Sequence, residues 1–171
     1  MPGRSARALA VAESFTVRLA VESDAPGISA LINSQLHHRA PTPTNPAPPE
    51  FLAGFSREAI HGYIGSARYS YLVALIERQL VGVLGIRDGQ HLLHFFVAGP
   101  YQRRGIARAL WSRAKSDLLA ASTGEVRLIV RSSVYAIPVY ERFGFQASGP
   151  RVEAVGVTYV PMQIVIRNGH C

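Results

Sequence analysis

Three apolar stretches follow one another in the middle of the chain, and their short connections leave few ways to fold them. The stretches are Tyr71–Ile76, Leu80–Ile86 and His91–Val97. The second connection contains Asp88-Gly89, a strong signal for a tight turn. Apolar segments of this length with hairpin-sized connections pair as neighbouring antiparallel strands. We therefore predict an antiparallel meander in this region.

The flanking sequence alternates between strand and helix patterns. Apolar residues at helical spacing predict helices over residues 24–38, 56–66, 105–121 and 135–143. Further strands are expected over residues 15–19, 125–131, 145–148 and 155–166. A helix between two strands makes a parallel crossover, which the chain combines with the meander. The fold class is therefore mixed α/β (α+β), with a central sheet flanked by helices.

The length of 171 residues suits one domain. We expect residues 1–14 to form a flexible tail and residues 15–171 to form the domain. The proline-rich stretch at 40–49 interrupts the pattern as a loop, because its prolines remove backbone donors. The single cysteine, Cys171, excludes an internal disulfide framework and a thiolate-rich metal site.

The charge of the chain favours an anionic partner without pointing to nucleic acid. Eighteen Lys and Arg stand against eleven Asp and Glu, for a net charge of +7. The basic residues are scattered, and aromatic residues do not alternate with them as a single-strand platform requires. We therefore expect no nucleic-acid partner. Since no long apolar segment occurs, we also expect no membrane partner and a cytoplasmic location.

The stretch Phe95–Arg108, with sequence FFVAGPYQRRGIAR, carries the strongest chemical signal. An apolar strand ends in a Gly-Pro turn, and Gly105 then opens a helix beside several arginines. A helix N-terminus offers unpaired N–H groups to a phosphate, and glycine allows close approach of the anion. On these residues alone, an ordinary turn with a solvated basic face explains the pattern equally well.

Two blocks resemble motifs of the GNAT superfamily of acyl-CoA-dependent N-acetyltransferases. Residues 102–107 fit the acyl-CoA motif Gln/Arg-x-x-Gly-x-Gly/Ala, and Val-x-x-Pro-Tyr at 97–101 fits the strand and turn before it. The later block resembles Asn-x-x-Ala-x-x-x-Tyr-x-x-x-Gly-Phe through Ala136, Tyr140, Gly144 and Phe145. Ser133 stands where the family often has Asn, which puts that side-chain contact in doubt.

The resemblance implies a GNAT-type fold of about seven strands and about four helices, with acetyl-CoA as co-substrate. Phosphate contacts would come from Arg104, Gly105, Ala107 and Arg108, and contacts to acetyl and pantetheine from Val97 and Gly99. The full set of cofactor-binding residues implied in this way is Val97, Gly99, Gln102, Arg103, Arg104, Gly105, Ile106, Ala107, Arg108, Ser133 and Ala136.

Two catalytic residues follow from the same comparison. A phenol stays protonated at neutral pH, so Tyr140 could protonate the departing thiolate. His91 is the favoured general base, since several relatives carry a Glu or His six residues before the position of Val97. Regular alternation would put His91 on the face of Phe95 and Val97, with His94 opposite. His94, Glu153 and the Tyr159 region remain alternatives for the base.

The expected activity is transfer of acetyl from acetyl-CoA to a primary amine, by direct attack in a ternary complex. A small-molecule acceptor is favoured; a protein lysine or N-terminus, or a non-catalytic acyl-CoA-binding module, is the alternative. In the family, the segment after the first helix borders the acceptor, and homodimers are common. No His, Asp or Glu cluster has metal-ligand spacing, so no metal is expected.

Overall fold

The computed structural model describes residues 14–36, 49–154 and 157–169. The strands are β1 (Thr16–Leu19), β2 (Tyr69–Ile76), β3 (Gln79–Arg87), β4 (His91–Val97), β5 (Val126–Ser132), β6 (Gln146–Ala147), β7 (Val152–Ala154) and β8 (Val157–Ile166). The helices are α1 (Ala25–Gln35), α2 (Pro49–Ala53), α3 (Arg57–Ile64), α4 (Ile106–Ala120) and α5 (Ile137–Arg142). Short 3₁₀ turns lie at Glu22–Asp24, Gly99–Tyr101 and Val134–Ala136.

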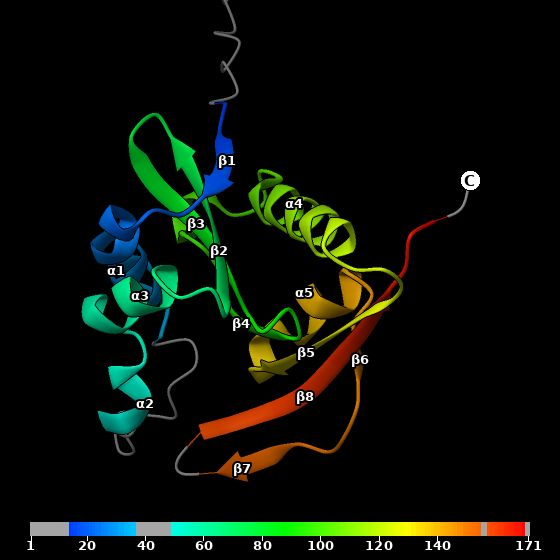
Figure 1. The fold of residues 1–171 in the computed structure, drawn as a ribbon. Helices are drawn as coiled ribbons and strands as arrows, with labels where there is room; N and C mark the ends of the chain where they lie inside the picture. Colours follow the sequence, from blue (N-terminus) through cyan, green and yellow to red (C-terminus); the bar gives the residue numbers. More distant parts are fainter. Residues whose placement is uncertain (1–13, 37–48, 155–156, 170–171) are drawn as a thin grey trace, which may run out of the picture.

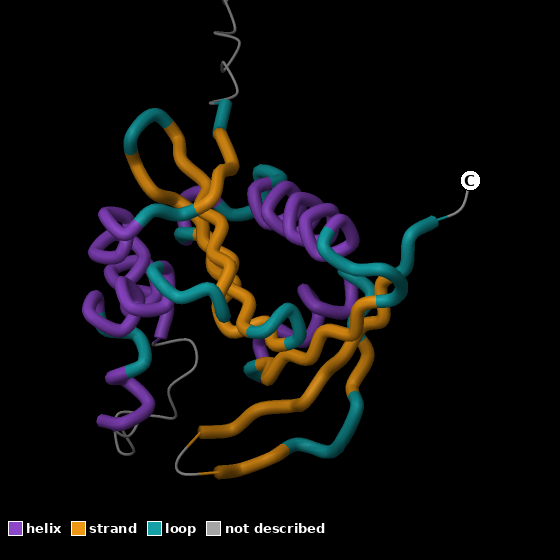
Figure 2. Tube along the Cα trace, viewed as in Figure 1, coloured by secondary structure: helices purple, strands orange, loops and turns teal. Residues whose placement is uncertain are grey.

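The strands form one twisted sheet in the order β1-β2-β3-β4-β5-β8-β6, with β7 pairing to the first residues of β8 (Figure 1; orange in Figure 2). All pairs are antiparallel except β4–β5. This confirms the predicted mixed fold and its meander. The described residues hold eight strands and five α-helices, against about seven and about four expected.

The differences have local causes. Gly149 and Pro150 separate β6 from β7, because proline cannot donate to the ladder. The helix α2 begins at Pro49, where the fixed φ of proline suits a helix start. The rest of the proline-rich loop, and residues 1–13 of the expected tail, lie outside the described residues. No helix in the described part of the chain combines the length and apolarity needed to cross a membrane.

Two cores lie on opposite faces of the central strands. On one face, α4 buries Leu110 and Trp111 against Leu84 of β3. On the other face, α1 and α3 bury Ile28 and Ile60 against the same strands. Because both faces are covered, β2 and β3 are apolar throughout rather than alternating. Figure 1 shows the two helical groups on either side of the sheet.

A β-bulge in β4 changes which face its first residues occupy. Gly85 pairs with His94 and Ile86 with Leu92, so Leu93 has no partner in β3. Paired residues of neighbouring strands point to the same face. Consequently His91, paired with Arg87, shares the face of His94. The prediction that His91 lies on the face of Phe95 and Val97 is therefore wrong, because the extra residue reverses the alternation.

Tyr71 lies flat across Gly85 to reach His94. The three residues form one row across β2, β3 and β4. A Cβ on Gly85 would approach Tyr71 Cε1 to 2.4 Å, so only glycine leaves room for the ring. The hydroxyl of Tyr71 and Nδ1 of His94 form a buried hydrogen bond of 2.8 Å.

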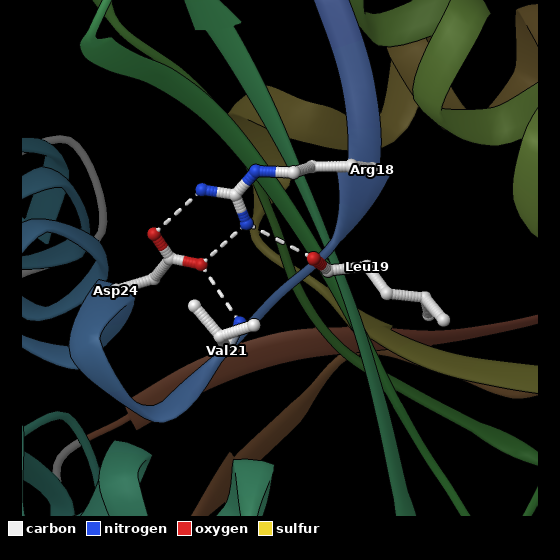
Figure 3. Close-up of polar contacts among 4 residues, drawn as sticks. All are labelled: Arg18, Leu19, Val21 and Asp24. Atoms are coloured by element: carbon white, nitrogen blue, oxygen red, sulfur yellow. Dashed lines mark hydrogen bonds and ion pairs between the residues drawn. The ribbon is translucent and has the colours of Figure 1, made fainter.

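An ion pair ties β1 to the start of α1 (Figure 3). Arg18 donates from Nη1 and Nη2 to the two carboxylate oxygens of Asp24, at 2.7 and 3.0 Å. The amide of Val21 donates to the same carboxylate at 2.8 Å. The hydrogen bond from Arg18 is the largest cause that lowers the pKa of Asp24, and partial burial opposes it.

We expect Asp24→Asn to lower the free energy of unfolding by about 1–2 kcal/mol at pH 7, the range for a charged hydrogen bond with a half-exposed partner. Since the folded pKa is depressed, the stabilisation is present above the ordinary carboxyl pKa of about 3.9 and is lost as pH falls through the lower, folded value. Urea unfolding of the wild type and the variant at pH 7 measures the lost stability. The same comparison below pH 4 measures how far the difference disappears.

Asp117→Asn is the matched control, because it breaks an exposed pair with Arg113 within α4. That change should cost less than about 0.5 kcal/mol. Equal effects of the two variants would contradict a special role for the Asp24 carboxylate.

Candidate functional site

A cleft of about 1090 Å³ opens where β4 and β5 separate. The two strands pair only at His91–Ile129 and Leu92–Val130, and then diverge. The predicted residues that line the cleft are Val97, Gln102, Arg103, Gly105, Ile106, Ala107, Arg108, Ala136 and Tyr140. Further lining residues are Gln35, Phe95, Phe96, Tyr101, Trp111, Ser112, Lys115, Val139, Arg142 and Phe143.

The turn into α4 is shaped to bind an anion. Arg103 and Gly105 have φ of 61° and 83°, both left-handed, and Gly105 is the N-cap of the helix. Such turns point successive N–H groups into one concavity, and the first N–H groups of the helix have no partner within it. A Cβ on Gly105 would meet nothing within 4 Å. Glycine is therefore required at this position by the backbone angle rather than by crowding.

Side chains fix this turn to the sheet. Gln102 Nε2 donates to the carbonyl of Val97 at 3.0 Å, which closes the end of β4. The hydroxyl of Tyr101 donates to Gln79 Oε1 at 3.1 Å, and the guanidinium of Arg104 lies 5.3 Å from the centre of the Tyr101 ring. The anion-binding geometry is thus held before any ligand arrives.

Positive charge continues along the cleft beyond the turn. Arg108 and Lys115 line it from α4, and Arg142 lines it from α5. The two motifs did not point to Trp111, Ser112, Lys115 and Arg142. The first three follow Arg108 at helical spacing, so periodicity along α4 could have revealed them.

The other part of the cleft reaches Tyr140. This side chain is 3% exposed, and its ring packs against those of Phe95 and Phe145, with centres 6.3 and 5.3 Å away. The chain turns sharply after α5, where Gly144 has φ of 97° and the amide of Phe145 bonds to the carbonyl of Tyr140. The phenol therefore lies in an apolar wall of the cleft.

Backbone groups of β4 face the cleft opposite Tyr140. The amide of Ala98 donates to Val81 of β3 at 2.8 Å. Successive N–H groups in a strand point to opposite edges, so the N–H groups of Val97 and Phe95 point away from β3 and toward the divergence. This arrangement places hydrogen-bond donors along one wall of the cleft.

A family model described as "Acetyltransferase (GNAT) domain" matches residues 39–166. This match covers well over half of the chain. The chain belongs to the GNAT acetyltransferase family. No curated protein matches it significantly in sequence.

Solved GNAT structures share the fold. The PaiA N-acetyltransferase of Thermoplasma acidophilum, in complex with coenzyme A, is 16% identical over 88% of this chain and 98% of its own, with a TM-score of 0.69. The ribosomal-protein-S18-alanine N-acetyltransferase of Escherichia coli is 19% identical over 92% and 97%, with a TM-score of 0.60. A phosphinothricin acetyltransferase of Sinorhizobium meliloti, in complex with AcCoA, is 19% identical over 91% and 90%, with a TM-score of 0.63.

Some residues implied by the resemblance to the GNAT family do not line the cleft. These are Gly99, Arg104, Ser133 and His91. Ser133 replaces the frequent Asn of the family, and its hydroxyl accepts a hydrogen bond from the amide of Ala136 at 3.3 Å. It therefore caps the turn before α5, which positions Ala136 and Tyr140.

His91, His94 and Glu153, three of the candidate bases, have different surroundings. His91 is half-buried, and its Nδ1 atom is buried with no hydrogen-bond partner among the described residues. His94 is 5% exposed, bonded to Tyr71 and enclosed by Phe55 and Phe96. Burial is the main cause that raises the pKa of Tyr71 far above its usual range, so its hydroxyl stays protonated. Glu153 lies exposed on β7, 3.7 Å from Arg151.

Metal ligation has no support in residues 14–36, 49–154 and 157–169. Among them, no three His, Cys, Asp or Glu side chains are grouped so that they could hold an ion.

Proposed function

We propose that the protein transfers the acetyl group of acetyl-CoA to a primary amine of a small molecule, by direct attack in a ternary complex. The observation that carries the proposal is that one cleft combines two features. The N-terminus of α4, which suits an anion, lies in one part of it. Tyr140 and the unpaired backbone N–H groups of β4 lie in another part. Family membership supports acyl transfer, and the CoA and AcCoA complexes of structural neighbours support the co-substrate.

The phosphates of acetyl-CoA would be held by the loop at Arg103–Gly105 and by the first helical turn of α4. The N–H groups from Gly105 to Arg108 supply donors, and Arg103, Arg104 and Arg108 supply positive charge. Ala107 leaves space beside the backbone at this point. Val97 and Gly99 border the path from these amides toward Tyr140.

When bound, acetyl-CoA supplies an acetyl thioester to the site. The N–H of Val97 would donate to the acetyl oxygen, and the N–H of Phe95 points the same way, nearer to the closed end of the divergence. Tyr140 would hold the proton that the sulfur takes up on leaving. Its apolar wall of Phe95 and Phe145 excludes water from that transfer.

His91 is the proposed general base. It lies on the sheet face opposite Phe95, which is the face not occupied by α4. Its partial exposure lets an acceptor or a bridging water reach it, whereas His94 is enclosed by aromatic rings. At about 3.3 Å per strand residue, His91 is far enough from Val97 that a water relay is required.

Gly105→Glu should weaken binding of CoA by about a hundredfold or more, because it sets a like charge in a site where each charged hydrogen bond contributes about 1.5–3 kcal/mol. Calorimetric titration with CoA measures this. Gly105→Ala is the control, since it tests backbone strain alone in open space. Tight binding by the Glu variant would place the phosphates elsewhere.

Tyr140→Phe removes a proton donor and almost no volume. We expect kcat to fall about a hundredfold or more, in line with general-acid catalysis, while the Kd for CoA stays the same. Steady-state rates and calorimetry separate the two quantities. A kcat equal to that of the wild type would show that another group protonates the thiolate.

His91→Ala should lower kcat/KM at pH 7, with recovery as pH rises and the free amine becomes abundant. Rate profiles between pH 6 and 10 measure the effect. His61→Ala is the control, because His61 is exposed on α3 and pairs with Glu22. If the His91 and His61 profiles coincide, the base is another residue, and Glu153, which is exposed on β7, would be tested next.

A further inference from the structure

One face of β5 and β8 is covered by no described element. The residues that alternate on this face of β5, Arg127, Ile129 and Arg131, are all exposed. The opposite face buries Leu128 and Val130 in the core beneath α4. His91 pairs with Ile129, so it belongs to the uncovered face.

This face is positively charged. The strands β4, β5 and β8 contain no Asp or Glu at all. Arg127 and Arg131 make no ion pair with any described residue. Glu153 on β7 pairs with Thr158, which places it on the opposite face from Tyr159. A patch with one sign of charge raises the local concentration of ligands with the other sign.

Arg131 stands at the mouth of the divergence. It directly follows Val130, the last residue of β5 that pairs with β4. Its guanidinium lies 5.2 Å from the centre of the Tyr159 ring, which holds the charge in place on the surface. Because the strands are parallel, Arg131 is level with the Leu93–His94 part of β4, across the opening.

The cleft also reaches this side of the sheet. Phe96 and Gln35 line it, and both belong to the side packed by α1. If the α4 side holds acetyl-CoA, the acceptor has to approach from the side of His91 and Arg131. Arg131 does not itself line the cleft, but it stands on this side of the opening, so a ligand that approaches from here meets its positive charge.

We propose that the acceptor is a small primary amine that also carries an anionic group, a carboxylate or a phosphate, and that Arg131 binds this group. The inference rests on the proposed function and adds the class of acceptor. A guanidinium held against a ring forms two parallel hydrogen bonds to either anion. Polyamines and lysine-rich peptides are disfavoured by the same charge.

The test compares four-carbon amines that differ in their far end: 4-aminobutyrate, n-butylamine and 1,4-diaminobutane, with 3-aminopropyl phosphate as the phosphate arm. Shorter amino acids extend the panel. We expect kcat/KM for an anionic amine to exceed that of its neutral and cationic partners by about tenfold or more, the scale of one charged hydrogen bond. The two anionic arms then distinguish carboxylate from phosphate.

Arg131→Gln should raise the KM for the anionic amine about tenfold or more without changing the KM for acetyl-CoA, and it should raise rather than lower the rate with the diamine. Arg131→Lys keeps the charge and should restore part of the loss. Arg127→Gln is the matched control: it removes the same charge from the same face of β5, four residues before the mouth. It should change the KM less than twofold.

Four results would overturn the inference. Neutral or cationic amines that are acetylated better than anionic ones would contradict the acceptor class and leave acetyl transfer intact. Equal effects of the Arg131 and Arg127 variants would contradict the position. CoA binding without acetylation of any small amine would refute the proposed function itself, and acetylation of an acidic peptide alone would assign a macromolecular acceptor.

Discussion

β4 and β5 are hydrogen-bonded through two residue pairs only, and their edges then run apart. A continuous parallel pairing would bury the amides of Phe95 and Val97 in a ladder and fill the space that the cleft occupies. Instead, the end of β4 forms one wall, and α4 and α5 supply most of the remaining lining. The turn at Arg103–Gly105 follows from the same feature, because β4 ends at the opening and the chain must turn there into α4.

The bulge at Leu93 lies next to this divergence, and the two features act together. Bulges bend a strand and strengthen its twist, which moves the end of β4 away from β5. The same extra residue puts His91 and His94 on one face. Backbone N–H groups of β4 then point into the opening, while His91, His94, Arg127 and Arg131 share the sheet face opposite α4. The division into two chemical faces depends on one unpaired residue.

The sequence predicted the meander and α4 to within about two residues, because their apolar periods and turn residues are strong. It also predicted nine of the nineteen residues that line the cleft, since the motif specifies the backbone conformation of Gly105 and its neighbours directly. The bulge was not predictable in this way. The segment HLLHFFV is apolar on both faces, so a reversal of alternation leaves no mark on its pattern. The arginine face was also missed: alternation along β5 already places Arg127 and Arg131 on one face, but the position of that face next to His91 follows only from the pairing of β5 with β4.

Gly85 illustrates how a small residue in mid-strand can be tied to a large one across the sheet. Because Gly85 has no side chain, the ring of Tyr71 occupies the space above it. The hydroxyl of that ring is hydrogen-bonded to Nδ1 of His94. The two positions therefore carry one joint restriction rather than two separate ones. Among homologues, we expect them to vary together: an aromatic ring at position 71 should occur with glycine at 85, and larger residues at 85 should occur only where 71 has become small. Evolutionary drift at either position is limited by the state of the other.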